Sequence, residues 1–245
     1  MRRIVRTHLA PPTQIALDRR QECADAQHAA GLLNIDREWR SARQSRCLKT
    51  VLGTLRSMTS KRERCMYCCD SHATDIEHFW PKGTYPERMF RWLNLLLCCT
   101  ECGRLKGGRL PLLQGSPVLV DPTAEDPWDY LDFEPRLGLI VARYDPVAES
   151  ENVKGAETVK LLQLDRREAM NDGCLKSWRR LVDTLTTELR DSPLSEARLI
   201  GALAEADDHG LLGWCFSGTG SNSEPFITLR TEHPDIWNAC AESFV

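Results

Sequence analysis

Two Cys-x-x-C pairs constrain the fold of this 245-residue chain more than any other feature. Cys65 and Cys68 form the first pair, and Cys99 and Cys102 form the second. Each pair presents two sulfur atoms from one tight turn, so four thiolates can close a tetrahedral shell around a zinc ion. Such a shell leaves no coordination position open, and we expect a structural zinc. The alternative is a set of ordinary buried cysteines, which do not normally cluster in matched pairs.

Two further cysteines lie directly beside these pairs, and each could replace one ligand. Cys69 follows the first pair, and Cys98 precedes the second. We favour the four cysteines of the two pairs, because only this set keeps a two-residue spacer on both sides. Any chemistry must then come from residues between the pairs.

The segment between the pairs resembles the HNH endonucleases. Its blocks read Ile76-Glu-His-Phe-Trp-Pro-Lys82, Trp92-Leu-Asn-Leu-Leu96 and, after the last cysteine, Lys106-Gly107. The subfamily it looks most like comprises the PtuB-like nuclease subunits of Septu and retron-associated antiphage systems. The resemblance implies a ββα-metal core that is stapled by the zinc.

The resemblance also implies roles for three residues. Glu77 would bind a catalytic divalent cation, Mg(II) or Mn(II), and His78 would be the general base that activates water. Asn94 would hydrogen-bond the His78 ring or nearby backbone and fix the ring's tautomer and orientation. These groups suit a phosphodiester, which is a hard anion whose hydrolysis needs a hard cation and a proton acceptor. Asp75 could assist the cation, because it lies two residues before Glu77 and would share its strand face. For His78, the alternative is a buried histidine with a purely structural role.

One position departs from the family pattern. Directly after Cys102, where the family places a metal-binding Asn or His, this chain has Gly103. Water could replace one Mg(II) ligand with some loss of affinity, and Glu101 could compensate if local geometry brings it round. We expect an active HNH endonuclease with DNA as the favoured substrate, the effector of a bacterial antiphage complex. The alternatives are a catalytically silent, zinc-stabilised subunit that binds nucleic acid or a partner, and a non-enzymatic zinc module that binds RNA.

Charge is divided unevenly along the chain. Residues 1–110 contain 20 Lys and Arg against 11 Asp and Glu, a balance of +9, whereas the remainder contains 12 against 24, a balance of −12. We expect cations around the site to contact phosphates, with a solvated basic face as the alternative. These nucleic-acid-binding candidates are Lys82, Arg91, Arg104 and Lys106. The acidic second half is expected to face a partner protein.

The expected partner follows from the resemblance. The sequence has no Walker motif, so any nucleotide-driven control must come from another polypeptide. The family resemblance implies an ABC/SMC-like ATPase subunit, with a retron nucleic acid as an optional further component. The odd count of 11 cysteines, the lack of a secretory signal and the lack of an apolar window of membrane-spanning length predict a cytoplasmic protein without membrane contact.

The predicted fold class is α+β, mainly α, with the zinc-stapled ββα-metal (HNH) core embedded in N- and C-terminal helices beside a small β element. The predicted divisions are a helical region (1–60), the nuclease core (61–115), the β element (116–150) and a second helical region (151–245).

Hydrophobic spacing predicts helices over 16–30 and 35–57 and a long amphipathic helix around Leu175–Leu189. The apolar stripe of that long helix is expected to be core, with a partner groove as the alternative. Residues 218–223 are expected to form a flexible loop.

Overall fold

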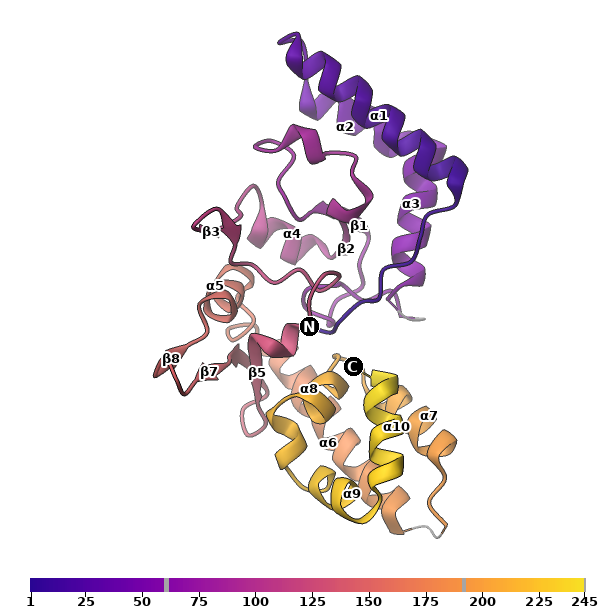
Figure 1. Cartoon of the computed structure of the whole chain (residues 1–245), viewed down its shortest axis with the longest axis vertical. Coiled ribbons are helices and arrows are strands. Elements are labelled where there is room, and N and C mark those ends of the chain that lie inside the picture. The colour runs from indigo at the N-terminus through magenta and orange to yellow at the C-terminus, as the bar shows by residue number, and fades with distance from the viewer. Residues whose placement is uncertain (60–61, 191–192, 245) are drawn as a thin grey trace. The chain divides into compact units, whose positions relative to one another are not determined.

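The computed structural model describes residues 1–59, 62–190 and 193–244 (Figure 1). The chain divides into two compact units. The N-terminal unit comprises Ile4–Met66 and Ser71–Leu112, and the C-terminal unit comprises the chain from Leu113 onward with Met1–Arg3 and Tyr67–Asp70. The four-part division expected from the sequence stays a prediction.

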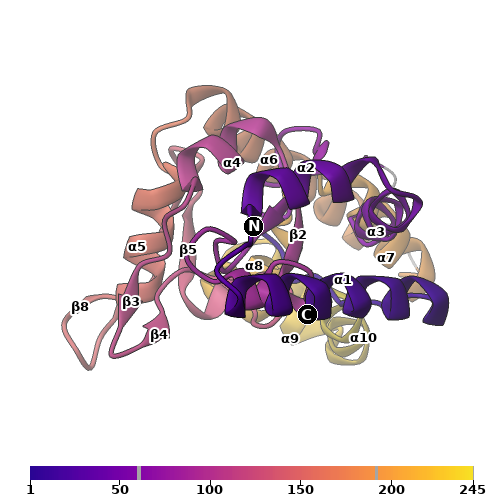
Figure 2. The same ribbon diagram turned by 90° about the horizontal axis from the view of Figure 1, so that it is seen from above.

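The N-terminal unit begins with three helices, α1 (Pro11–Ala29), α2 (Ile35–Gln44) and α3 (Arg46–Ser57). The prediction of one helix over 35–57 is wrong, because Ser45 adopts an extended conformation between α2 and α3. The Ser45 hydroxyl accepts a hydrogen bond from the Leu48 amide at 3.4 Å and so caps the start of α3. In Figure 2 α3 is seen end-on and α1 lies across its direction, and the two helices are in contact.

A two-stranded hairpin and a short helix follow in the same unit. Strand β1 (Asp75–His78) pairs antiparallel with β2 (Leu95–Cys98), and the register places Glu77 opposite Leu96. Every residue of β2 is buried, and two 3₁₀ turns, η1 (Pro86–Arg88) and η2 (Trp92–Asn94), lie in the connection. Helix α4 (Thr100–Lys106) starts directly after β2. It ends at Gly107, whose φ of +52° suits a residue without a side chain.

The strand–strand–helix order matches the arrangement expected between and after the cysteine pairs. That this arrangement is an HNH core stays a prediction.

The C-terminal unit is built mainly of helices. Among the described residues from Leu112 onward, the strand segments form three two-stranded sheets, β3 (Leu112–Leu113) with β4 (Ser116–Pro117), β5 (Leu131–Glu134) with β6 (Leu139–Ala142), and β7 (Tyr144–Asp145) with β8 (Ser150–Glu151). The turn η3 (Pro127–Asp129) precedes β5. The remaining elements are α5 (Val153–Leu162), α6 (Glu168–Arg190), α7 (Glu196–Ala206), α8 (Leu212–Ser217), η4 (Thr219–Asn222), α9 (Phe226–Glu232) and α10 (Pro234–Phe244). The prediction of a mainly helical chain with small sheets is confirmed.

The apolar stripe of α6 is core, as the sequence predicted. Leu181 and Leu185 are fully buried, and the Trp178 ring stacks on Phe226 with ring centroids 5.8 Å apart. The expected flexible loop at 218–223 is wrong, because η4 packs on the Trp214 ring. A side chain at Gly220 would lie 2.5 Å from that ring, so only glycine allows this close approach.

None of the helices in the described ranges combines the length with the apolar character that crossing a bilayer requires.

Candidate active site and metal centre

The structure brings the four cysteines of the two pairs into one buried cluster. The Sγ atoms of Cys65, Cys68, Cys99 and Cys102 all lie within 4.8 Å of one another. A zinc ion with Zn–S bonds of about 2.3 Å requires sulfur atoms roughly 3.8 Å apart, so a small contraction closes the shell. The donor set therefore fits a structural metal such as zinc.

Local backbone geometry explains why the second pair presents its sulfurs together. Cys99 is the N-cap of α4, and its Sγ accepts a hydrogen bond from the Cys102 amide at 3.4 Å. Amide donors of this kind stabilise a thiolate. The neighbouring Cys98 thiol instead donates to the Cys99 carbonyl at 3.2 Å. Cys98 and Cys69 both lie outside the group of four mutually close sulfurs.

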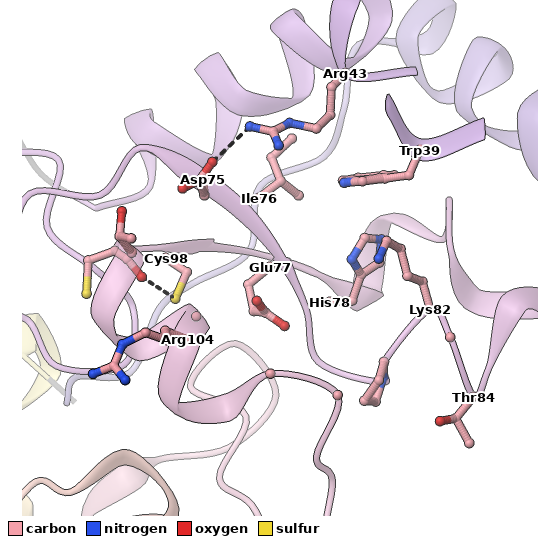
Figure 3. Close-up of a pocket in the computed structure, with 17 residues that line it drawn as sticks. Trp39, Arg43, Asp75, Ile76, Glu77, His78, Lys82, Thr84, Cys98 and Arg104 are labelled. Carbon is pink, nitrogen blue, oxygen red and sulfur yellow. Dashed lines mark hydrogen bonds and ion pairs between the residues drawn. The ribbon is translucent and has the colours of Figure 1, made fainter. Parts of the chain in front are cut away.

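Beside this cluster, a cavity of about 610 Å³ opens in the N-terminal unit (Figure 3). Strand β1 contributes Glu77 and His78 to its lining, and α4 contributes Gly103 and Arg104. Helix α2 contributes Trp39 and Arg43, which sequence reasoning did not assign to the site. Both residues fall in the helix predicted over 35–57, and no sequence signal showed which part of the fold that helix would cover.

His78 is held as a neutral imidazole in one tautomer. Its Nε2 lies 3.0 Å from the Met89 carbonyl oxygen, which can only accept, so Nε2 carries the proton and Nδ1 keeps its lone pair. The Trp39 ring meets the imidazole edge-on, with ring centroids 4.3 Å apart. Burial lowers the pKa of His78 to about 3, and the side chain is only 5% exposed.

Asn94 organises the connection that supplies the Met89 carbonyl. Its Oδ1 accepts from the Trp80 amide at 2.7 Å, and its Nδ2 donates to the carbonyls of Trp80 and Arg88 at 3.0 and 2.9 Å. The sequence offered two partners for Asn94, the His78 ring or nearby backbone, and the structure places it on backbone. Because Arg88 directly precedes Met89, these bonds fix the loop that orients the His78 ring.

Glu77 is paired with a buried lysine. Lys106 Nζ lies 3.0 Å from Glu77 Oε1 and 2.7 Å from the His78 carbonyl oxygen. Burial raises the pKa of Glu77, and the Lys106 ammonium acts in the opposite direction. The expected phosphate contact of Lys106 is not possible in this structure, because its side chain is 0% exposed. Its positive charge is instead paired with Glu77 inside the N-terminal unit.

The other predicted residues differ in their relation to the cavity. Lys82 and Arg104 line it, whereas Arg91 does not and instead pairs with Asp25 at 3.7 Å. Asp75 lines the cavity and pairs with Arg43 at 3.0 Å. Glu101 is exposed on α4 and is not part of the lining, so it does not replace a ligand at Gly103.

The cavity can accommodate a hydrated cation next to Glu77. A Cβ atom on Gly103 would lie 3.6 Å from Glu77 Oε2, so this oxygen faces the position where the family pattern has its last ligand. Glu77 offers one carboxylate oxygen to a cation there, and water would have to complete the coordination of any hard cation. One protein oxygen would hold such a cation only weakly.

We predict that Cys102→Ser lowers the bound zinc below one ion per chain. Structural zinc sites contribute on the order of 10 kcal/mol, so the loss of one sulfur should lower Tm by more than roughly 10 °C. Metal analysis and thermal unfolding of the purified variant measure both effects. Cys98→Ser is the matched control and should keep its zinc; loss of zinc from that variant alone would reverse the ligand assignment.

The buried His78 also predicts a pH dependence of stability. Between about pH 3, its folded pKa, and about 6.5, its unfolded pKa, the unfolded chain binds a proton that the folded chain does not. The free energy of unfolding should therefore fall as pH drops through this window, by about 2 kcal/mol from pH 7 to pH 5 for this residue. Urea unfolding of the wild type and His78→Gln at both pH values tests this, since the variant should lack that share. Equal losses would place the His78 pKa near its ordinary value.

Comparison with known proteins finds a partial similarity to a Septu protein. The chain is 29% identical over 108 residues to the Septu protein PtuB of Bacillus thuringiensis. The matched stretch covers 42% of this chain and 37% of that relative, so the chain spans well under half of the relative's length. No family model matches the chain. The similarity is to a Septu protein, over a part of each chain.

Proposed function

We propose that this protein is a metal-dependent endonuclease that hydrolyses phosphodiester bonds in nucleic acid, with DNA as the favoured substrate. The observation that carries the proposal is the cavity that Glu77 and a tautomer-fixed His78 both line, next to a four-cysteine cluster. A carboxylate, a neutral imidazole and nearby cations are the groups that hydrolysis of a phosphodiester requires.

His78 would act as the general base. Its Nδ1 holds the lone pair that accepts the water proton, while the Nε2–H bond to Met89 keeps the ring in place. A pKa of about 3 makes the free imidazole a weak acceptor. A phosphate bound in the cavity would raise that pKa, because a nearby negative charge favours the imidazolium. Base strength would therefore increase when substrate is present.

Glu77 would hold Mg(II) or Mn(II) through Oε2, and the cation would neutralise charge that develops on the phosphate. Lys82 and Arg104, which line the cavity, would hold the flanking phosphates. The four cysteines would bind zinc and keep α4 and the hairpin in their relative positions. Zinc would take no part in the reaction, because its shell is closed.

The biological setting rests on similarity. The resemblance to PtuB-like subunits, together with the match to a Septu protein, supports a role as the effector of a bacterial antiphage complex in the cytoplasm. The partner would be an ABC/SMC-like ATPase, with a retron nucleic acid as an optional component. The acidic balance of −12 after residue 110 suits contact with a protein better than contact with nucleic acid.

The first test is plasmid nicking with Mg(II) or Mn(II), by the chain alone and with any ATPase encoded beside it. His78→Ala should lower the nicking rate at least roughly 100-fold, because general-base catalysis is removed. Zinc content and Tm of the variant must match the wild type for this comparison to count. Equal nicking by His78→Ala would exclude His78 as the base.

A second candidate function is a catalytically silent, zinc-stabilised subunit that binds nucleic acid or a partner. Gly103 favours it, because the position facing Glu77 Oε2 supplies no ligand. Salt-dependent binding of DNA or RNA, without nicking under any metal condition, would support this function over the nuclease.

We predict that Gly103→Asn lowers the Mn(II) concentration needed for half-maximal nicking. A Cβ added at Gly103 would lie 3.6 Å from Glu77 Oε2 and 3.8 Å from Cys98 Sγ, which are ordinary van der Waals distances, so a Cβ atom fits there and points the new side chain at Glu77. A gain of roughly tenfold is expected for one added oxygen ligand. Gly103→Ala controls for the change in helix propensity and should leave the Mn(II) requirement unchanged. An unchanged requirement in both variants would show that the missing ligand does not limit the site.

A further inference from the structure

Lys106 is the feature of this site that neither the resemblance nor the charge pattern explains. It lies in the last turn of α4, three residues after Gly103, and its side chain is completely buried. A buried ammonium is strongly unfavourable unless acceptors surround it. A lysine that only contacted phosphates would gain nothing from this position, so its role must lie with the groups it touches.

The two acceptors of Lys106 both belong to β1. One is Glu77 Oε1 at 3.0 Å, and the other is the His78 carbonyl oxygen at 2.7 Å. The same lysine therefore ties α4 to the side chain of one proposed site residue and to the backbone of the next. Both bonds are charge-assisted, which makes them stronger and more directional than bonds between neutral groups.

The two oxygens of the Glu77 carboxylate therefore have different surroundings. Oε1 is held by the ammonium, and Oε2 is directed toward Gly103. Glu77 is 18% exposed, so the carboxylate reaches the cavity while the lysine does not. A cation in the cavity would meet a single oxygen of a carboxylate whose charge is already shared with a neighbouring cation.

We propose that Lys106 is a positioning residue that fixes Glu77 and β1 for catalysis and, in doing so, weakens the binding of a divalent cation at Glu77. The proposal rests on the proposed nuclease function for its catalytic half. Its cation-binding half stands without any cleavage.

The two halves predict changes of opposite sign. Lys106→Met keeps a side chain of similar length and removes the charge. Mn(II) should then bind roughly tenfold more tightly, because one positive charge next to Glu77 is gone. Nicking should fall roughly 100-fold, because the carboxylate and the His78 backbone lose their anchor. If Lys106 had only a structural role, its replacement would lower both the Mn(II) affinity and the nicking rate, or change neither.

The experiment measures Mn(II) binding by electron paramagnetic resonance, and nicking in parallel, for the wild type and Lys106→Met. Zinc content and Tm report whether the variant is folded. Lys160→Met is the matched control, since Lys160 is exposed and paired with Glu157 at 3.2 Å on α5. That control should change neither Mn(II) affinity nor nicking.

A double-mutant cycle assigns the effect to Glu77. In a Glu77→Gln background, Lys106→Met should no longer change Mn(II) affinity, because the carboxylate that links the two cations is absent. Lys106→Gln serves the same cycle if Lys106→Met does not fold. Unchanged or weaker Mn(II) binding in the folded lysine variant would overturn the proposal. If Lys106→Met binds Mn(II) more tightly but neither it nor the wild type nicks DNA, the cation-binding half of the proposal holds and the nuclease function is rejected.

Discussion

The convergence of four cysteines is the constraint on which the rest of the site depends. Cys99 and Cys102 occupy the start of α4, directly after β2, and the first pair reaches the same point from a turn whose Met66 amide donates to the Leu97 carbonyl. Without that junction, a pair of four-residue strands and a seven-residue helix would be too short to be stable alone. The cluster thus adds to the apolar burial of β2 in holding this small module together.

Hydrogen bonds and one ion pair then fix the side chains that line the cavity. Asn94 holds the loop whose Met89 carbonyl sets the His78 tautomer, and Lys106 holds Glu77 from the opposite side. Each of these groups is largely buried and satisfied by backbone or by a partner charge, which limits the freedom of the side chains that face the cavity. Glu77 and His78, the proposed catalytic residues, are thus positioned by Lys106 and Asn94, which take no direct part in the proposed reaction.

Much of this site could be predicted from the sequence, for a physical reason. Cysteine spacing reports a local turn, and the order of Glu77, His78 and Asn94 is a local pattern, so both are readable along the chain. The break at Ser45 was not readable, because neither proline nor glycine lies within five residues of it. Burial of Lys106 was not readable either, since lysine is usually exposed and only the packing of α4 on β1 makes it interior. The contributions of Trp39 and Arg43 depend on the same kind of contact between distant segments.

The register of β1 with β2 has a consequence for how this region can change over time. Asp75 stands opposite Cys98, one residue before the helix cap at Cys99, so the strand that carries Glu77 and His78 is aligned directly against the segment that carries the cysteines. Side chains alternate between the two faces of a strand, and a shift by one residue would exchange the faces that Glu77 and His78 occupy. A single-residue insertion or deletion within either strand of this hairpin would therefore be far more damaging than most substitutions.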